Sequence, residues 1–368
     1  MNKNKLDYQK YTAFINREKE LNYLKEYINI HPESILFLHG PKSSGKTTLL
    51  YKFFEQIEKQ QKLDVKFLNL RKRFIPNYKD FLRIFFGVDY SKSREDVKEK
   101  REYDLKFFKL SVEVLKGMET GELDPFVIME TEFLKQTKKG IKPVVIIDEL
   151  QSIDHIYMNN GKDRQLIIEL FNFFVAMTKE SHLAHVIIAS SDGYFLYTVY
   201  NDSRLKKTSE FYKVDYLIKE DVLEWLLNLE KYSKIKDYTL TPEDAEKIWN
   251  TVGGSMWEIQ HLLDQLFSNP LDEVLSLYLK KIKVMIGHYI GTDDKKEKIL
   301  RLFLTKEEAN TRDFIQAGIA KEELEDLLRD MVRNNILYFD PTEGIYYPQG
   351  KSYQEGIRLF FQEIANSA

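Results

Sequence analysis

The chain has 368 residues, more than one hydrophobic core normally organises, so two or three domains are expected. Its 43% hydrophobic and 31% charged composition is typical of a globular protein, and a net charge of −3 argues against a polycation that binds nucleic acid. The absence of cysteine excludes disulfides, thiolate zinc sites and a cysteine nucleophile. There is no apolar run of membrane-spanning length and no apolar segment behind the basic start, so a cytoplasmic protein without membrane contact is expected.

The first 217 residues alternate between predicted helices and strands. Helical spacing predicts an amphipathic helix over 17–30 and a second helix over 45–59. Residues 72–140 are expected to be mostly helical, and a further helix is expected over 164–180. Short apolar runs predict buried strands at 34–40, 63–70, 143–148, 184–190 and 211–217. Strands that alternate with helices imply a parallel sheet with right-handed crossovers.

The rest of the chain is predicted to be helical before it ends in a different pattern. Residues 218–290 are expected to be helical throughout. Three further helices are expected over 293–304, 311–317 and 320–334. A β-hairpin is then predicted over 336–349, where two short apolar runs flank the turn Pro-Thr-Glu-Gly. Three helices followed by a hairpin are the outline of a winged helix.

The clearest chemical signal is a phosphate-binding loop. It matches the pattern GxxxxGK[ST] and lies between a predicted buried strand and a helix. Glycines let the backbone wrap around phosphate, and the amides of the helix N-terminus attract it. The residues predicted to contact nucleotide are Gly40, Pro41, Lys42, Ser43, Ser44, Gly45, Lys46, Thr47 and Thr48. Lys46 is expected to reach the β- and γ-phosphates of ATP and Thr47 to hold Mg²⁺. The alternative, a glycine-rich turn that binds nothing, is disfavoured by the complete motif.

Polar side chains follow two of the later predicted strands. Asp148 is expected to hold the Mg²⁺ shell, and Glu149 to orient and polarise the attacking water. Such a pair can instead cap the next helix, but on a chain with a phosphate loop it favours hydrolysis. Ser190 and Ser191 end the next strand, where they are predicted either to approach the γ-phosphate or to cap the following helix.

The segment over 14–21 resembles F-x-[GN]-R-E-x-E-L, the opening of the archaeal ATPase family within the AAA+ and STAND group of NTPases. Further blocks at 146–149, 189–191, 253–254 and 334–349 occur in the family's order, so the resemblance covers nearly the whole chain. It implies that Phe14 and Arg17 lie against adenine and ribose, whereas the residues alone also fit a solvated first helical turn.

The family resemblance also implies the architecture. A P-loop α/β domain over 1–217, with its parallel sheet in 5-1-4-3-2 order, is expected to be followed by a helical lid over 218–290 and a winged-helix domain over 291–368. Two features depart from the family or stay open. The lid reads Gly-Gly-Ser-Met at 253–256 in place of Gly-Gly-x-Pro and carries no arginine, which argues against direct lid sensing of the γ-phosphate. Arg204 resembles a family arginine that faces nucleotide in cis or from a neighbour, with a surface arginine as the alternative.

The leading functional interpretation is a Mg²⁺-dependent ATPase whose nucleotide state moves the lid and winged helix on a macromolecular partner. The alternatives are a slow STAND-type ATP/ADP switch and a DNA-binding regulator. Over 320–334 three basic residues stand against five acidic ones, a balance of −2 that disfavours phosphate contacts. A protein partner is therefore expected at the winged helix. Nucleic acid stays possible but disfavoured, with the basic stretches 71–73 and 92–109 as its better candidates.

Overall fold

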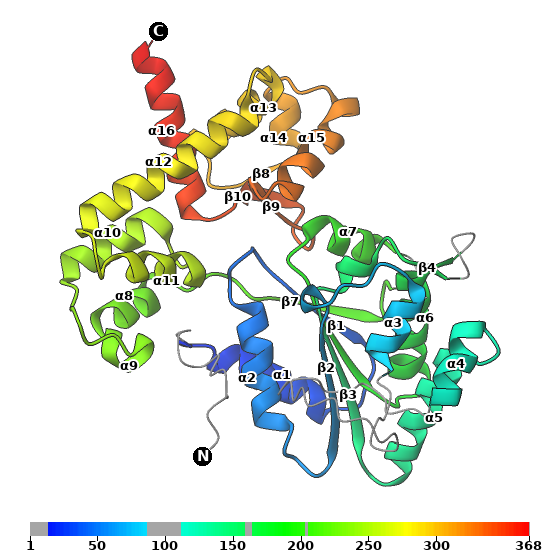
Figure 1. Ribbon diagram of the computed structural model, residues 1–368. Coiled ribbons are helices and arrows are strands. Elements are labelled where there is room, and N and C mark those ends of the chain that lie inside the picture. Colours follow the sequence, from blue (N-terminus) through cyan, green and yellow to red (C-terminus); the bar gives the residue numbers. More distant parts are fainter. Residues whose placement is uncertain (1–13, 87–111, 159–163, 203–204, 368) are drawn as a thin grey trace.

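The computed structural model describes residues 14–86, 112–158, 164–202 and 205–367 (Figure 1). A five-stranded parallel sheet in the order β2-β3-β6-β1-β7 forms the centre of the N-terminal part. Its strands are β1 (Ile35–His39), β2 (Leu63–Asn69), β3 (Lys142–Asp148), β6 (His185–Ala189) and β7 (Ser209–Lys213). Numbered along the chain, this order is 5-1-4-3-2, so the predicted topology is confirmed.

The sheet is buried on both faces because helices cover both, and alternate side chains of each strand point to opposite sides. Ile35 and Phe37 of β1 lie in a hydrophobic cluster with α3, α5 and α6, whereas Leu36 and Leu38 lie in another with α1 and α2 (Figure 1). This double coverage explains why the strands read as continuous apolar runs. The helices of this part are α1 (Glu18–Asn29), α2 (Lys46–Ile57), α3 (Tyr78–Phe85), α4 (Val112–Thr120), α5 (Pro125–Lys138), α6 (Leu166–Val175) and α7 (Gly193–Asn201).

Two details of the N-terminal part differ from the prediction. The last strand ends at Lys213 rather than 217, because β1, its partner in the sheet, ends at His39. A two-stranded sheet of β4 (Tyr157–Met158) and β5 (Arg164–Gln165) was not predicted. Strands of two residues are too short to show any hydrophobic periodicity.

Five helices follow β7 within residues 218–290, as the helical spacing predicted, and this segment is called the lid below. They are α8 (Lys219–Leu227), α9 (Leu229–Ser233), α10 (Pro242–Val252), α11 (Met256–Gln265) and α12 (Leu271–Ile290). Helix α10 begins at a capping box in which Thr241 and Asp244 bond reciprocally, with Pro242 as its first residue. Even α12, with 20 residues, is not apolar enough to cross a bilayer, and neither is any other helix in the described ranges.

Residues 294–348, called the C-terminal unit below, contain the three predicted helices and the predicted hairpin. The elements are α13 (Asp294–Arg301), β8 (Ala309–Asn310), α14 (Thr311–Gln316), α15 (Lys321–Arg333), β9 (Leu337–Asp340) and β10 (Ile345–Pro348). Strand β8 adds to the hairpin and makes a three-stranded antiparallel sheet in the order β8-β10-β9.

The final helix, α16 (Lys351–Ser367), was not predicted. It follows the C-terminal unit and crosses α12 of the lid, against which it packs (Figure 1). The two helices approach closely at Gly356, where an added Cβ would lie 2.6 Å from the side chain of Ile282. One hydrophobic cluster therefore extends from the lid through α16 into the C-terminal unit.

Candidate nucleotide-binding site

The predicted phosphate loop connects β1 to α2 in a backbone conformation that depends on glycine. Gly40, Ser43 and Gly45 have positive φ values of 147°, 67° and 94°. A Cβ at Gly40 would lie 2.1 Å from the carbonyl oxygen of Val214, so no larger residue fits there. Helix α2 begins after Gly45 without a side-chain cap. Its first backbone amides are therefore available to an anion such as phosphate.

Lys46, the first residue of α2, is buried against its own loop. Its ammonium donates to the carbonyl oxygens of Gly40 at 2.7 Å and Pro41 at 2.8 Å. Burial lowers the pKa of Lys46 to about 8, an effect that the carboxylates of Glu149 and Asp148 oppose. A phosphate close to this ammonium would favour its charged form further, and phosphate oxygens can take the place of the loop carbonyls.

Sheet register brings Asp148 beside two polar side chains from other elements. Asp148 pairs with Asn69 in the β2–β3 ladder, and the Asn69 amide donates to Asp148 Oδ2 at 2.8 Å. Thr47 Oγ1, from α2, donates to the same oxygen at 2.8 Å. Burial raises the pKa of Asp148 to about 6, although the Thr47 hydrogen bond lowers it. The phosphate loop and the acidic pair therefore meet at one edge of the sheet.

The donor set at this edge fits Mg²⁺. The second carboxylate oxygen of Asp148, Oδ1, is buried and has no hydrogen-bond partner within the described residues. Mg²⁺ prefers such oxygen ligands and usually keeps waters and nucleotide phosphates in its shell. The part of the chain that the structure describes holds no cluster of three His, Asp or Glu side chains able to bind a metal by themselves. Thr47 and Asp148 would thus hold the ion together with the nucleotide.

Glu149 follows β3 in a left-handed backbone conformation, with φ of 66°. Its carboxylate is buried, and Oε2 forms an ion pair with the guanidinium of Arg71 at 2.8 Å and accepts a hydrogen bond from Gln151 Nε2 at 2.9 Å. Arg71 belongs to η2 (Leu70–Lys72), the single helical turn directly after β2. The predicted water-orienting carboxylate is therefore already engaged by two side chains.

The two serines after β6 have different surroundings. Ser190 is fully buried, and its hydroxyl accepts the backbone N–H of Asp192 at 3.0 Å, one residue before α7. Helix α7 itself is capped by Asp192, whose carboxylate accepts the N–H of Tyr194 and Phe195. Ser190 therefore closes the turn before the helix and does not cap it. Ser191 lines the cleft beside the phosphate loop. Arg204 lies outside the described residues.

Arg17 braces the phosphate loop from the side of α1. Its buried guanidinium donates to the carbonyl oxygens of Ser44 at 2.9 Å and Asp215 at 2.7 Å, and it pairs with Glu20 at 2.6 Å. It is not a solvated residue of a first helical turn. Phe14 packs against the same side of the sheet as α1 and α2. Contact of these two side chains with adenine and ribose stays a prediction.

A cleft of about 720 Å³ opens beside the loop, within the usual volume of a small-molecule site. Its polar side carries loop residues from Lys42 to Thr48 together with Arg71 and Glu149. The lid and α16 also line the cleft, with both polar residues, among them Glu258 and Lys281, and apolar ones. The apolar and aromatic residues include Met256, Trp257, Ile282, Met285 and Tyr353.

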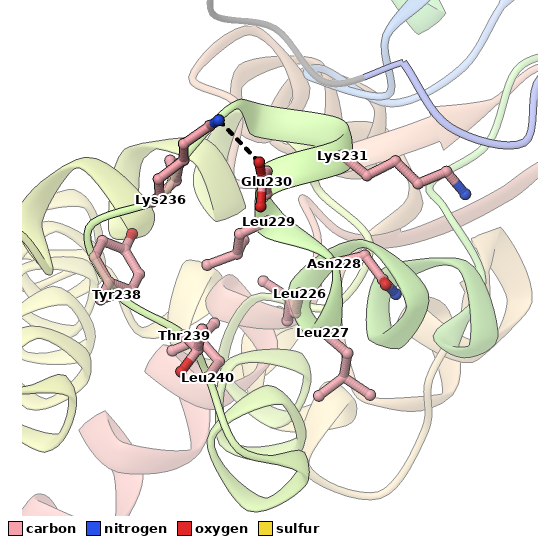
Figure 2. A pocket seen from close by; sticks show the side chains of 11 residues that line it. Leu226, Leu227, Asn228, Leu229, Glu230, Lys231, Lys236, Tyr238, Thr239 and Leu240 are labelled. Atoms are coloured by element: carbon pink, nitrogen blue, oxygen red, sulfur yellow. Dashed lines mark ion pairs between the residues drawn. The ribbon is translucent and has the colours of Figure 1, made fainter.

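A second cavity, of about 440 Å³, lies within the lid between α9 and the segment that leads to α10 (Figure 2). Aliphatic side chains such as Leu226, Leu229 and Leu240 line it, and an ion pair of 2.9 Å joins Glu230 to Lys236 at its edge (Figure 2). None of the phosphate-loop or acidic residues lines this cavity.

The C-terminal unit contacts the strand that carries the phosphate loop. His39 Nδ1 lies 3.1 Å from the Tyr338 hydroxyl of β9, and Lys213 pairs with Asp340 at 3.1 Å. On the neighbouring helix, a Cβ at Gly193 would lie 2.4 Å from the carbonyl oxygen of Phe339. The end of β1 is therefore covered by a strand almost 300 residues further along the chain.

Sequence reasoning missed Asn69 and Gln151 and gave Arg71 no role at the acidic pair. Asn69 lies at the end of the strand predicted over 63–70 and Arg71 directly follows that strand, and ligands gather at the carboxyl ends of parallel strands. That rule, combined with the 5-1-4-3-2 order that places β2 beside β3, could have predicted that Asn69 and Arg71 lie beside the acidic pair.

The sheet order and the phosphate loop define a P-loop NTPase. Residues 14–262 match an ATPase domain found predominantly in Archaea, and the chain belongs to this archaeal ATPase family. An ATP-binding protein of Methanocaldococcus jannaschii is 34% identical, over 92% of this chain and 92% of its own. One of Pyrococcus abyssi is 33% identical, over 96% of this chain and 99% of its own. The protein is thus an ATP-binding member of the family.

A solved structure agrees on the fold. The Walker-type ATPase of Pyrococcus abyssi superimposes with a TM-score of 0.64 at 16% identity, over 96% of this chain and 99% of that one. At this level of identity the likeness concerns the fold alone.

Proposed function

We propose that the protein binds ATP with Mg²⁺ in the cleft beside the phosphate loop and hydrolyses it. The observation that carries the proposal is the 2.8 Å hydrogen bond between Thr47 Oγ1 and Asp148 Oδ2. It joins the two motifs of a P-loop ATPase at the carboxyl edge of the sheet, where ligands of such sheets bind.

Each residue of the site has a distinct task in this proposal. Lys46 and the amides at the start of α2 bind the β- and γ-phosphates. Thr47 and Asp148 hold Mg²⁺, which when bound neutralises phosphate charge. Glu149 orients and polarises the attacking water by accepting a hydrogen bond from it. Ser191, which lines the cleft, lies where a hydroxyl can meet the terminal phosphate.

The contacts around the loop suggest how nucleotide state is transmitted. A Cβ at Gly45 would lie 3.0 Å from the sulfur of Met256, so the lid rests on the phosphate loop. Tyr338 reaches the strand before the same loop. In this proposal residues 1–217 form the ATPase domain, 218–290 the lid and 291–368 a winged-helix domain, and the latter two move with nucleotide state.

The partner that we propose for the winged helix is a protein. Helix α15 is acidic, and its Arg329 is engaged within the molecule: it pairs with Glu325 at 2.9 Å and lies 5.3 Å from the ring of Tyr194 on α7. A helix that tracks DNA phosphates needs basic side chains that are free to reach them.

A slow ATP/ADP switch is the second candidate. It is favoured by the ion pair and the hydrogen bond that engage Glu149 and by the absence of Arg or Lys from α11, the lid helix whose Met256 contacts the loop at Gly45. Both candidates need ATP binding, and they differ in turnover.

Phosphate release under saturating Mg-ATP separates them. The wild type should release phosphate over many turnovers. Glu149→Gln should bind ATP with similar affinity and hydrolyse it at least roughly 100-fold more slowly. Equal phosphate release by the two proteins would reject the catalytic role of Glu149. A wild type that binds ATP but stops after one turnover would establish the switch.

A further inference from the structure

We propose that Arg71 recognises the terminal phosphate of ATP, and that it exchanges its ion pair with Glu149 for that phosphate. The inference rests on the proposed function. It adds a residue outside the phosphate loop that distinguishes ATP from ADP.

Arg71 has the right position for this role. It follows β2 at the carboxyl edge of the sheet, two residues after Asn69, whose side chain bonds to Asp148. Its guanidinium lies 2.8 Å from Glu149 Oε2, and its side chain lines the same cleft as Lys46 and Thr47. A phosphate bound between Lys46 and Glu149 is therefore within reach of the guanidinium.

The ion pair between Arg71 and Glu149 is weak enough to be exchanged for a phosphate. The side chain of Arg71 is 60% exposed, whereas that of Glu149 is 11% exposed. Partly solvated pairs of this kind hold weakly. A terminal phosphate offers more charge and more acceptor oxygens than a carboxylate, and a guanidinium can bind two of those oxygens at once. Glu149 would still keep its hydrogen bond from Gln151, so its carboxylate is not left without a partner.

Four lysines, Lys42, Lys46, Lys72 and Lys281, also line the cleft, but each offers a single ammonium and not a planar pair of donors. Among the described residues that line it, Arg71 is the single arginine. Lys46 already serves the loop, and α11 of the lid has neither Arg nor Lys. Bidentate recognition of a phosphate from the described wall of the cleft therefore falls to Arg71.

The exchange would couple nucleotide identity to the carboxylate. With ADP, Arg71 stays on Glu149 and the carboxylate remains occupied. With ATP, the γ-phosphate draws Arg71 away and leaves Glu149 free to accept a proton from water. The same residue would thus report which nucleotide is bound, whether the protein is an efficient ATPase or a slow switch.

The test compares the affinities for Mg-ADP and for a non-hydrolysable Mg-ATP analogue, measured by calorimetry. Arg71→Ala should weaken analogue binding by about 10- to 100-fold, the value of one or two charge-assisted hydrogen bonds, and leave ADP binding almost unchanged. Arg71→Lys should recover part of the loss. Arg83→Ala is the matched control, because Arg83 is 57% exposed and pairs with Glu119 at 2.7 Å on a surface outside the cleft lining. It should change neither affinity.

Two results would overturn the inference in distinguishable ways. If the wild type binds neither nucleotide, the proposed function fails and the inference with it. If the wild type binds both and Arg71→Ala keeps the wild-type ratio of the two affinities, the proposed function stands and Arg71 does not read the terminal phosphate. A melting curve of each variant excludes misfolding, which is not expected for an exposed side chain.

Discussion

The imidazole of His39 is buried at the end of β1 with its Nδ1 3.1 Å from the hydroxyl of Tyr338. The two residues come from the strand that leads into the phosphate loop and from β9 of the C-terminal unit. Their hydrogen bond is thus a direct link between the candidate nucleotide site and the far end of the chain.

Tyr338→Phe is expected to destabilise the protein by about 1–2 kcal/mol, because it leaves the buried imidazole without this partner. Tyr347→Phe is the matched control: Tyr347 stands opposite Tyr338 in the hairpin, and its buried hydroxyl has no partner within the described residues. Removing that hydroxyl should cost little or nothing. Denaturant unfolding measures both, and equal losses would show that the His39 hydrogen bond contributes nothing.

Stability should fall as the solution is acidified, because His39 resists protonation. Burial is the main reason that its pKa falls from 6.5 to about 4, with the charges of Lys213 and Lys46 in the same direction and that of Asp340 opposing. Between these pH values the unfolded chain binds a proton that the folded chain does not, so acid favours unfolding. His39 alone should then remove about 2 kcal/mol between pH 7 and pH 5.

The variant His39→Asn tests this prediction through the slope of its unfolding free energy against pH. The free energy of unfolding of the variant should change less with pH over this interval than that of the wild type. His155→Asn, which alters an exposed histidine, should keep the wild-type slope. A steeper or unchanged slope for His39→Asn would contradict the assignment.

ATP should stabilise the protein through Lys46. At about 100 times its dissociation constant, Mg-ATP should add ~2.7 kcal/mol to the free energy of unfolding, a rise in melting temperature of roughly 5 °C. Lys46→Ala should lose most of this rise, whereas Lys19→Ala, an exposed change on α1, should keep it. A wild type without any nucleotide-dependent shift would remove the loop from the binding site.

Asp148 should make ATP binding depend on Mg²⁺. Chelating the metal should weaken binding to the wild type by roughly 10- to 100-fold, and Asp148→Ala should show a weak affinity that chelation barely changes. Asp154→Ala, at an exposed carboxylate nearby in the sequence, serves as the control. If Asp148→Ala keeps the full metal dependence, the ion is held elsewhere.

Any binding of duplex DNA by the full-length chain should be independent of α15. Each phosphate contact by Lys or Arg adds about 0.9 to the slope of log affinity against log salt concentration. Changing Arg329 and Arg333 together to Ala should leave both the affinity and this slope as in the wild type. Micromolar or tighter binding at physiological salt that the double change abolishes would make α15 a DNA-reading helix.

The sequence predicted the sheet well, because burial on both faces makes each strand an apolar run that stands out from the charged helices. It did not predict α16. That helix contains Gly356, which disfavours helix in isolation and is tolerated because it lets α16 approach Ile282. Such a reason exists only in the folded chain. The same holds for Arg71, which meets Glu149 only because β2 and β3 are neighbours.

The course of α16 also limits how the molecule can move. Because α16 directly follows the C-terminal unit and packs against α12, the lid and that unit share one continuous core, and we expect them to turn as one body. The chain passes from the sheet to the lid close to Gly254. A Cβ at Gly254 would lie 1.9 Å from the carbonyl oxygen of Leu217, four residues after the end of β7. A rotation there of a few degrees that lifts Met256 from the phosphate loop would also pull Tyr338 from His39. The two contacts on the loop would open and close in step.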